Sequence, residues 1–165
     1  MVAINKTIKS IRPYQPGKPI EEVKRQLGLK EVIKLASNEN PLGPSPKAQA
    51  AIRREIKGIN RYPEGSCFYL RKLLSRGLKI KPGNLIFGNG SDEIIDIIVK
   101  TFTEIDDEII TADVTFLEYK IISGQNGRKV KTVPLVDFKY DLGRIKDAVT
   151  SKTRVIFIAN PNNPT

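Results

Sequence analysis

A glycine-rich turn is the segment with the clearest potential for chemistry. It comprises Gly88-Asn89-Gly90-Ser91-Asp92 and follows a short apolar run. A helix that begins here would offer its free N–H groups to a phosphate, with the Ser91 hydroxyl as an extra donor. The same residues also make an ordinary helix start, in which Ser91 caps the helix and Asp92 complements its dipole. Taken alone, this segment leaves both interpretations open.

Residues that this turn lacks limit which phosphate-containing ligands it could bind. A nucleoside-triphosphate loop needs Gly-Lys followed by Ser or Thr, and the turn has no lysine. A dinucleotide fingerprint is matched in part, because Gly88 and Gly90 supply two of its three glycines. Asp113 lies past the next predicted strand, where a ribose-binding acid belongs, but Glu93 occupies the third glycine position. A nicotinamide-dinucleotide-binding domain therefore stays an alternative.

A second polar segment lies at 160–165 and reads NPNNPT, directly after an apolar stretch. Polar residues at the carboxyl end of a parallel strand line the crevice where α/β proteins bind ligands. An asparagine amide donates to a ligand oxygen without any change of charge. An isolated Asn-Pro pair is nevertheless more typical of a proline-braced turn. Two further polar loops, at 36–41 and 60–63, are by themselves also more typical of turns than of sites.

The 165 residues include no histidine and a single cysteine, Cys67. This composition excludes Ser-His-Asp and Cys-His catalysis, histidine-based metal sites and an internal disulfide. Acid–base chemistry near neutral pH must therefore come from Lys, Asp, Glu or Tyr with a perturbed pKa, or from a bound cofactor. We expect no metal site, and the single cysteine suits a reducing cytoplasm.

The formal net charge of +10 is compatible with nucleic-acid binding. Yet the basic residues are spread from Lys6 to Arg154, and short clusters such as Arg53-Arg54 lack interleaved aromatic residues, so we expect no nucleic-acid partner. No run reaches the roughly 18 to 20 apolar residues of a membrane span. The N-terminal residues also lack the apolar core of a signal peptide. We expect a cytoplasmic protein without a membrane partner.

The elements that must position these residues alternate along the chain. Residues 1–19 are predicted to form an extended arm, and 20–27 a short amphipathic helix that ends before Gly28. Further helices are predicted at 46–56, 68–76, 92–102, 116–123 and 142–149, and strands at 32–35, 85–87, 108–111, 130–135 and 154–159. In the helix at 92–102, Ile94, Ile95, Ile98 and Phe102 should face inward. This order predicts an α/β fold in three layers, with a mostly parallel sheet and flanking helices.

The last predicted strand is apolar from Val155 to Ala159, as expected for a strand that is covered on both faces. Only loop residues follow it in the sequence. A central strand needs a neighbour on each side and a connection that leads away from it. We therefore expect an N-terminal fragment of a larger enzyme, inactive when alone.

Five segments together resemble the pyridoxal-phosphate-dependent aminotransferases of fold type I (class I/II), and among these the histidinol-phosphate aminotransferases. The segments are KLASNENPLGPSP at 34–46, NRYPEG at 60–65, GNGSDEIIDI at 88–97, DVTFLEY at 113–119 and NPNNPT at 160–165. Several motifs in a consistent order are more specific than any one of them. Val114 stands where this group usually has proline and Ala36 where asparagine is common, and neither change removes a catalytic group.

The resemblance implies an organisation for the chain. Residues 1–45 would form the N-terminal arm and a small-domain segment, and residues 46–165 the N-terminal part of the cofactor-binding large domain. The lysine that forms the internal aldimine lies later in members of this family, as do the aspartate that faces the pyridine nitrogen and the substrate arginines. The resemblance therefore places no catalytic residue in this chain.

It also implies pyridoxal 5′-phosphate as the cofactor and a set of contacts to it. The cofactor phosphate would be held by Gly90, Ser91 and Asp92. Phe116, by itself typical of a core aromatic, would stack on the pyridine ring. Asn163 would donate a hydrogen bond to the ring hydroxyl oxygen, which helps the ring to act as an electron sink.

Partners and substrates follow from the same resemblance. Tyr62 would extend to the cofactor phosphate of a neighbouring subunit, which implies a homodimer. Tyr14 and Asn38 would face the substrate, with Tyr14 near its phosphate end. The implied reaction is transfer of an amino group from L-histidinol phosphate to a 2-oxoacid such as 2-oxoglutarate, in histidine biosynthesis. An aromatic aminotransferase, a threonine-phosphate decarboxylase and a non-catalytic interaction module are the alternatives.

Overall fold

The computed structural model describes residues 3, 5–11, 13–14 and 16–165, so five positions of the predicted arm (1, 2, 4, 12 and 15) lie outside the described residues. The chain divides into two compact units. We call Met1–Tyr14 with Leu85–Thr165 the sheet unit, and Gln15–Asn84 the helical unit. The predicted domain boundary between residues 45 and 46 concerns a complete enzyme and stays a prediction.

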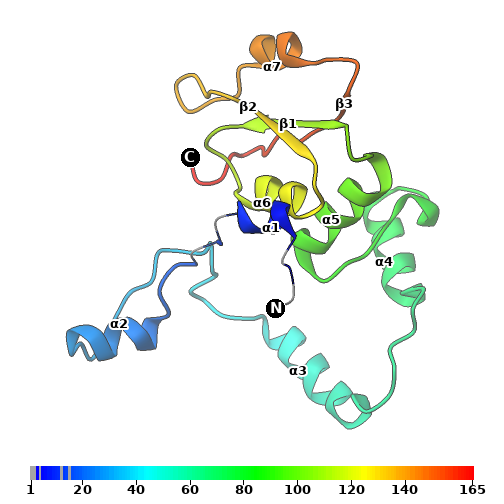
Figure 1. The fold of residues 1–165 in the computed structure, drawn as a ribbon. Helices are drawn as coiled ribbons and strands as arrows, with labels where there is room; N and C mark the ends of the chain where they lie inside the picture. Colours follow the sequence, from blue (N-terminus) through cyan, green and yellow to red (C-terminus); the bar gives the residue numbers. More distant parts are fainter. Residues whose placement is uncertain (1–2, 4, 12, 15) are drawn as a thin grey trace. The chain divides into compact units, whose positions relative to one another are not determined.

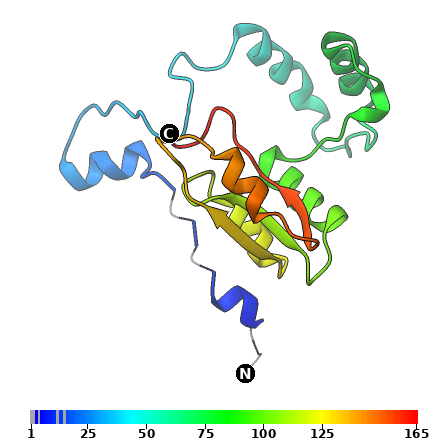
Figure 2. The same cartoon turned by 90° about the horizontal axis from the view of Figure 1, so that it is seen from above.

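The sheet unit contains three parallel strands in the order β2-β1-β3 (Figure 1). Their bounds are Glu108–Ala112 for β1, Lys129–Val133 for β2 and Thr153–Ile156 for β3. Helices α6 (Glu118–Gln125) and α7 (Leu142–Ala148) connect them. Helix α7 covers one face of the sheet, while α6 and α5 (Gly90–Phe102) lie on the other (Figures 1 and 2). The short helix α1 (Lys6–Lys9) packs on α6, so the predicted extended arm is wrong for these residues; Asn5 caps this helix with its side chain. This arrangement confirms the predicted three-layer α/β fold with a parallel sheet.

The central strand β1 supplies apolar side chains to both faces of the sheet. Ile109 and Ile110 are fully buried, and successive residues of a strand point to opposite faces. Ile109 belongs to a cluster with residues of α5, α6 and β3, namely Ile95, Val99, Ile122 and Phe157. Ile110 packs against Val133 of β2 and Ile145 of α7. A strand covered on both faces needs this continuous apolar run.

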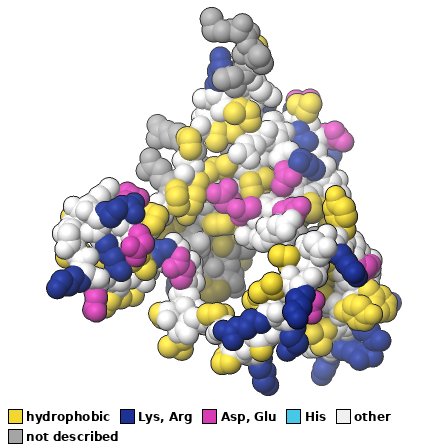
Figure 3. Space-filling view, turned by 90° about the horizontal axis from the view of Figure 1, so that it is seen from below, with side chains coloured by type: hydrophobic (Ala, Val, Ile, Leu, Met, Phe, Trp, Pro, Cys, Tyr) yellow, Lys and Arg dark blue, Asp and Glu magenta, His cyan; other side chains and the backbone are white. Residues whose placement is uncertain are grey.

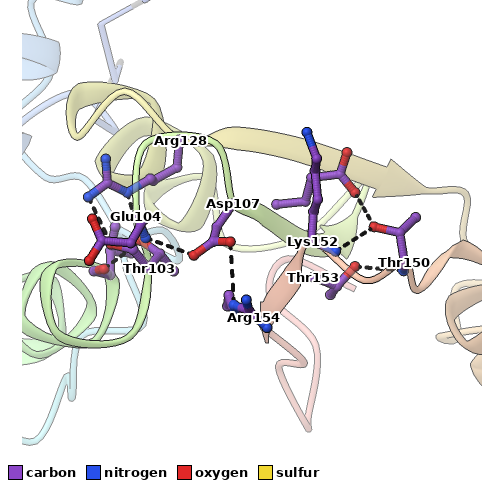
Figure 4. Close-up of polar contacts among 10 residues, drawn as sticks. Thr103, Glu104, Asp107, Arg128, Thr150, Lys152, Thr153 and Arg154 are labelled. Atoms are coloured by element: carbon purple, nitrogen blue, oxygen red, sulfur yellow. Dashed lines mark hydrogen bonds and ion pairs between the residues drawn. The ribbon is translucent and has the colours of Figure 1, made fainter.

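A polar network ties the connections at the amino end of the sheet (Figure 4). The Arg128 guanidinium donates from Nε to Thr103 Oγ1 at 2.7 Å and from Nη2 to the Thr103 carbonyl at 2.9 Å. In the following loop, the Asp107 carboxylate accepts from the Glu104 backbone N–H at 2.8 Å and lies 3.3 Å from Arg154 Nε. The end of α5 and the starts of β2 and β3 are thereby held together.

The helical unit follows the predicted helices closely. Helix α2 (Ile20–Leu27) ends before Gly28, which has a φ of +65°, as a left-handed helix end requires. Ser45 Oγ accepts from Ala48 N at 3.1 Å and caps α3 (Pro46–Glu55). Helix α4 spans Phe68–Leu78, and the 3-10 turns η1 (Ile56–Gly58) and η2 (Pro82–Asn84) follow α3 and α4.

None of the helices α2, α3 and α4 has a buried residue. Ile52 of α3 and Leu73 of α4 are both more than half exposed. The region of α3 and α4 shows apolar side chains between those of lysine and arginine (Figure 3). Within the part of the chain that the structure describes, the helical unit therefore has apolar faces that nothing covers.

Two predicted strands are wrong. Residues 32–35 and 85–87 are not in strands, Ile33 and Leu35 are almost fully exposed, and Ile86 is more than half exposed. Apolar and β-branched residues favour extended backbone, but a strand also needs a neighbour to pair with. The described sheet consists of β1, β2 and β3 and includes neither segment.

The burial of two predicted elements also differs. Phe102 was expected to face inward but is 62% exposed, because α5 ends at this residue and no further turn covers the ring. Strand β3 ends at Ile156, although Phe157 N still donates to Ile110 O at 2.9 Å. Phe157 is buried, but Ile156 and Ile158 are 40% and 46% exposed; coverage of this strand on both faces was expected of a larger enzyme and stays a prediction. Here β3 is an edge of the sheet.

The Arg128 network predicts a measurable contribution to stability. Exchange of Arg128 for alanine leaves the Thr103 carbonyl without its charged donor, so we expect the free energy of unfolding to fall by about 2 to 3 kcal/mol. The neighbouring Lys129 is exposed, and its exchange for alanine should change that energy by less than about 0.5 kcal/mol. Urea denaturation of the purified chain measures both. Equal effects of the two variants would contradict a structural role for the network.

Candidate functional site

The glycine-rich turn leads directly into α5. Asn89 is the N-cap residue of this helix, and no side chain caps it. Glu93 folds back instead, and its Oε2 accepts from the Asn89 backbone N–H and from Asn89 Nδ2, the latter at 3.0 Å. The interpretation in which Ser91 caps the helix is therefore wrong. The Gly90 N–H donates to the Gly88 carbonyl oxygen at 2.9 Å, and the following first-turn N–H groups of α5 are uncapped by side chains, as an anion-binding helix start requires.

The two glycines of the turn are needed for different reasons. Gly90 has a φ of +83°, a backbone conformation that residues with a side chain rarely adopt. A Cβ at Gly88 would lie 3.0 Å from Ile94 Cδ1 and 3.1 Å from Glu93 Oε2. Gly88 thus allows close packing of the turn on α5. Glu93 stands where a dinucleotide fingerprint has glycine. Here its carboxylate holds the turn by accepting hydrogen bonds from Asn89.

A hollow of about 480 Å³ joins this turn to a set of aromatic rings. Gly90 and Ser91 line it, as do Phe116, Tyr119 and Phe157. The Phe116 and Tyr119 rings meet edge to face with centroids 5.5 Å apart, and Tyr119 stacks on Phe157 at 4.6 Å. Burial raises the pKa of Tyr119, and proximity to Tyr140 adds to this shift, so Tyr119 stays neutral at physiological pH.

A second, smaller hollow of about 210 Å³ shares Phe116 with the first. Its other lining residues include Tyr14, Thr115, Asn163 and Pro164. Asn163 belongs to the polar loop after β3, and Thr115 and Phe116 to the loop after β1. The carboxyl ends of two neighbouring parallel strands therefore meet here, as α/β proteins commonly arrange their ligand sites.

The structure brings together five of the eight residues that the sequence singled out. Gly90, Ser91, Phe116, Asn163 and Tyr14 all line one or both hollows. The side chain of Asp92 is exposed at the start of α5 and lines neither hollow. The other two, Asn38 and Tyr62, lie in the helical unit.

Beside these hollows the structure joins side chains whose contact with one another the sequence did not predict. Thr115 Oγ1 lies 2.6 Å from the Tyr140 hydroxyl and donates to Asn162 Oδ1 at 2.8 Å. Asn162 Nδ2 donates to the Val114 carbonyl at 3.1 Å and to Thr165 Oγ1 at 2.7 Å. No local pattern indicates such a group, because its members are distant in sequence.

Asp113 has a structural role at the end of β1. Its Oδ1 accepts from the Val114 backbone N–H at 2.8 Å and from the Leu135 N–H at 3.1 Å. The carboxylate thereby joins the loops after β1 and β2. One oxygen of the acid that a nicotinamide site would use for its ribose is therefore engaged with the backbone.

Two carboxyl groups near the site have shifted pKa values. Burial raises the pKa of Glu118, and the negative charge of Asp92 raises it further. The pKa of Asp96 is lowered by hydrogen bonds from Lys100 Nζ at 2.6 Å and Asn126 Nδ2 at 2.8 Å.

Among the described residues, no group of three or more acidic or cysteine side chains is placed to hold a metal ion. No helix in the described part of the chain is long and apolar enough to cross a membrane.

The structure thus combines a parallel α/β sheet with a glycine-rich turn that opens a helix beside two hollows. A family model described as "Aminotransferase class I and II" matches residues 30–165. The chain belongs to this aminotransferase family.

Individual relatives are similar over almost the whole chain. A histidinol-phosphate aminotransferase of Moorella thermoacetica is 51% identical over 158 residues, which are 96% of this chain and 41% of that protein. One from Desulfotalea psychrophila is 45% identical over 162 residues, or 98% of this chain and 43% of that protein. The chain thus spans about two fifths of the length of these curated relatives.

Solved structures agree with the fold. The crystal structure of histidinol-phosphate aminotransferase from Sinorhizobium meliloti in complex with pyridoxal-5′-phosphate matches with a TM-score of 0.86 and 26% identity, and covers 100% of this chain and 44% of that one. A Thermus thermophilus aspartate aminotransferase matches with a TM-score of 0.80 at 19% identity, over 100% of this chain and 46% of that one. At that identity the second match shows the fold alone.

Asn162 and Asn163 are neighbours with different surroundings, which makes them a matched pair. Exchange of Asn162 for alanine removes the hydrogen bonds to Val114 and Thr165 and leaves Thr115 without its acceptor. We expect the free energy of unfolding to fall by about 1.5 to 3 kcal/mol. Asn163 is exposed, and its exchange should change that energy by less than about 0.5 kcal/mol. Urea denaturation followed by circular dichroism measures both, and a larger effect at Asn163 would contradict the assignment.

The raised pKa of Glu118 predicts a pH-dependent stability. A carboxyl whose pKa is higher in the folded than in the unfolded state stabilises the fold at low pH, and this contribution is lost as pH rises through the folded pKa. Glu118→Gln, which stays neutral, should therefore raise Tm at pH 7, and the gain should disappear below about pH 4, near the unfolded pKa. Exchange of the exposed Glu31 for glutamine is the control. A gain in Tm that is the same at both pH values would contradict this expectation.

Proposed function

We propose that this chain forms the phosphate- and ring-binding part of a pyridoxal-5′-phosphate-dependent aminotransferase. The amino donor is L-histidinol phosphate and the acceptor a 2-oxoacid such as 2-oxoglutarate, in histidine biosynthesis. The donor is supported by the names of relatives that are 51% and 45% identical. The observation that best supports this cofactor is the hollow that joins the start of α5 to Phe116.

The described residues fit the phosphate of this cofactor. The N–H groups of Ser91 and Asp92 are uncapped by side chains and lie at the positive end of a helix of 13 residues, while the Gly90 N–H donates to the Gly88 carbonyl oxygen at 2.9 Å and would have to turn from it toward a phosphate. Glu93 holds its carboxylate against Asn89, at the base of the turn. We assign the phosphate to these N–H groups, with the Ser91 hydroxyl as an additional donor.

The aromatic rings that line the larger hollow, those of Phe116, Tyr119 and Phe157, suit the pyridine ring of this cofactor. At about 480 Å³ the hollow lies within the range of small-molecule sites. In the proposed site Phe116 offers its face to the ring and excludes water from that side, and Asn163 donates its amide to the ring hydroxyl oxygen. When bound, the cofactor supplies the electron sink for the reaction. None of the lysines in this sequence is assigned a covalent role.

We assign the remaining residues to substrate and partner. Tyr14 lines the smaller hollow beside Asn163, which supports a place near the phosphate end of the substrate. Asn38 is proposed to face the substrate as well. Tyr62 is fully exposed and belongs to the unit whose helices have uncovered apolar faces. This supports a homodimer in which Tyr62 contacts the cofactor phosphate of the partner. We place the protein in the cytoplasm, where its single cysteine stays reduced.

Binding of pyridoxine 5′-phosphate to the purified chain tests the proposed site. This probe lacks the aldehyde and cannot react with surface lysines, so calorimetry reports binding alone. We expect it to bind at least about tenfold more tightly than pyridoxine, because only the phosphorylated form engages the start of α5. Gly90→Ala should weaken binding about tenfold, since the positive φ opposes a side chain.

The matched control is Gly83→Ala, because a Cβ added at this position would have no atom within 4 Å. This variant should bind the probe as tightly as the unchanged chain. NADH serves as the competing ligand class. Binding of NADH without binding of pyridoxine 5′-phosphate would contradict the proposed function and favour a nicotinamide site.

A further inference from the structure

Three side chains from three different loops form a compact hydrogen-bonded group in the sheet unit. Thr115 follows β1, Tyr140 precedes α7, and Asn162 follows β3. Thr115 is only 7% exposed, so its hydroxyl depends on protein partners. We call this group the Thr115–Tyr140–Asn162 network.

Each member of the network contacts the other two. The Ala159 backbone N–H donates to the Tyr140 hydroxyl oxygen at 3.0 Å. The Tyr140 hydroxyl lies 3.3 Å from Asn162 Oδ1 and 2.6 Å from Thr115 Oγ1, and Thr115 Oγ1 lies 2.8 Å from the same Asn162 oxygen. The three side chains therefore form a closed triangle of hydrogen bonds, and hydrogen bonds in such a group strengthen one another.

These contacts make Tyr140 a link between two loops. Its hydroxyl contacts Ala159 and Asn162 in the loop after β3 and Thr115 in the loop after β1. Thr115 is adjacent in sequence to Phe116, and Asn162 to Asn163. The network thus joins the loop that carries Phe116 to the loop that carries Asn163.

We propose that Tyr140 is a positioning residue for the pyridine ring: its hydroxyl, through Thr115 and Asn162, fixes the spacing between Phe116 and Asn163. This inference rests on the proposed function, since it concerns the ring of the same cofactor. Tyr140 lines neither of the two hollows that Phe116 shares, but, with Asn162, a separate hollow of about 300 Å³. In the proposed site it acts on the pyridine ring through its neighbours.

The position of the network gives this inference a distinctive consequence. The phosphate turn at 88–92 contributes no member to it. Loss of the Tyr140 hydroxyl should therefore weaken contacts to the ring while leaving the phosphate contacts unchanged. A residue that merely stabilised the whole unit would weaken both alike.

The experiment compares Tyr140→Phe with the unchanged chain for two probes, pyridoxine 5′-phosphate and inorganic phosphate, by calorimetry. We expect the affinity for pyridoxine 5′-phosphate to fall about three- to tenfold and that for inorganic phosphate to stay within about twofold. Thr115→Val should behave like Tyr140→Phe, and Thr115→Ser, which keeps the hydroxyl, should restore the affinity for pyridoxine 5′-phosphate. The exposed Tyr69 provides the matched control, Tyr69→Phe, with no change for either probe.

Each outcome tests either the positioning role of Tyr140 or the proposed function of the site. If the unchanged chain binds pyridoxine 5′-phosphate and Tyr140→Phe binds it equally well, the positioning role is overturned and the proposed function stands. Equal losses for both probes would also overturn the positioning role. If the unchanged chain does not bind the probe, the proposed function falls and this inference falls with it. Should Tyr140→Phe fail to fold, the comparison of Thr115→Val with Thr115→Ser carries the same test.

Discussion

Parallel pairing of β1 with β2 and β3 is the constraint on which the site depends. In a parallel sheet all carboxyl ends lie at one edge, so the loop after β1 and the loop after β3 must meet there. The first loop carries Thr115 and Phe116, and the second carries Asn162 and Asn163. A parallel sheet requires a long connection between its strands, and α6 and α7 provide these connections and also cover the two faces.

Hydrogen bonds stabilise both ends of the sheet. At the amino end, Arg128 and Asp107 hold backbone groups of the connecting loops. At the carboxyl end, the Thr115–Tyr140–Asn162 network joins the loops that carry Phe116 and Asn163. Substitutions at the amino end can therefore change stability without touching the two hollows, whereas substitutions in the network change stability and binding together.

The sequence predicted the parallel α/β fold and a turn that leads into α5, because periodicity and glycine positions are local signals. It did not predict that Glu93 folds back onto Asn89 in place of a cap by Ser91, since a long side chain has many rotamers. The strands expected at 32–35 and 85–87 failed because strand formation depends on a distant neighbour, which a short apolar run does not reveal. The contacts of Thr115 with Tyr140 and Asn162 span 25 and 47 residues, and nothing local encodes them.

Phe116 belongs to the lining of both hollows, so a ligand group in either one touches the same ring. When a group seated in the larger hollow restricts this ring, it also changes the surface that a second group meets in the smaller hollow. Thermodynamic linkage makes such an effect reciprocal: the factor by which the first group alters the affinity for the second equals the factor by which the second alters the affinity for the first. Any coupling of this kind between the two hollows would pass through the shared side chain of Phe116.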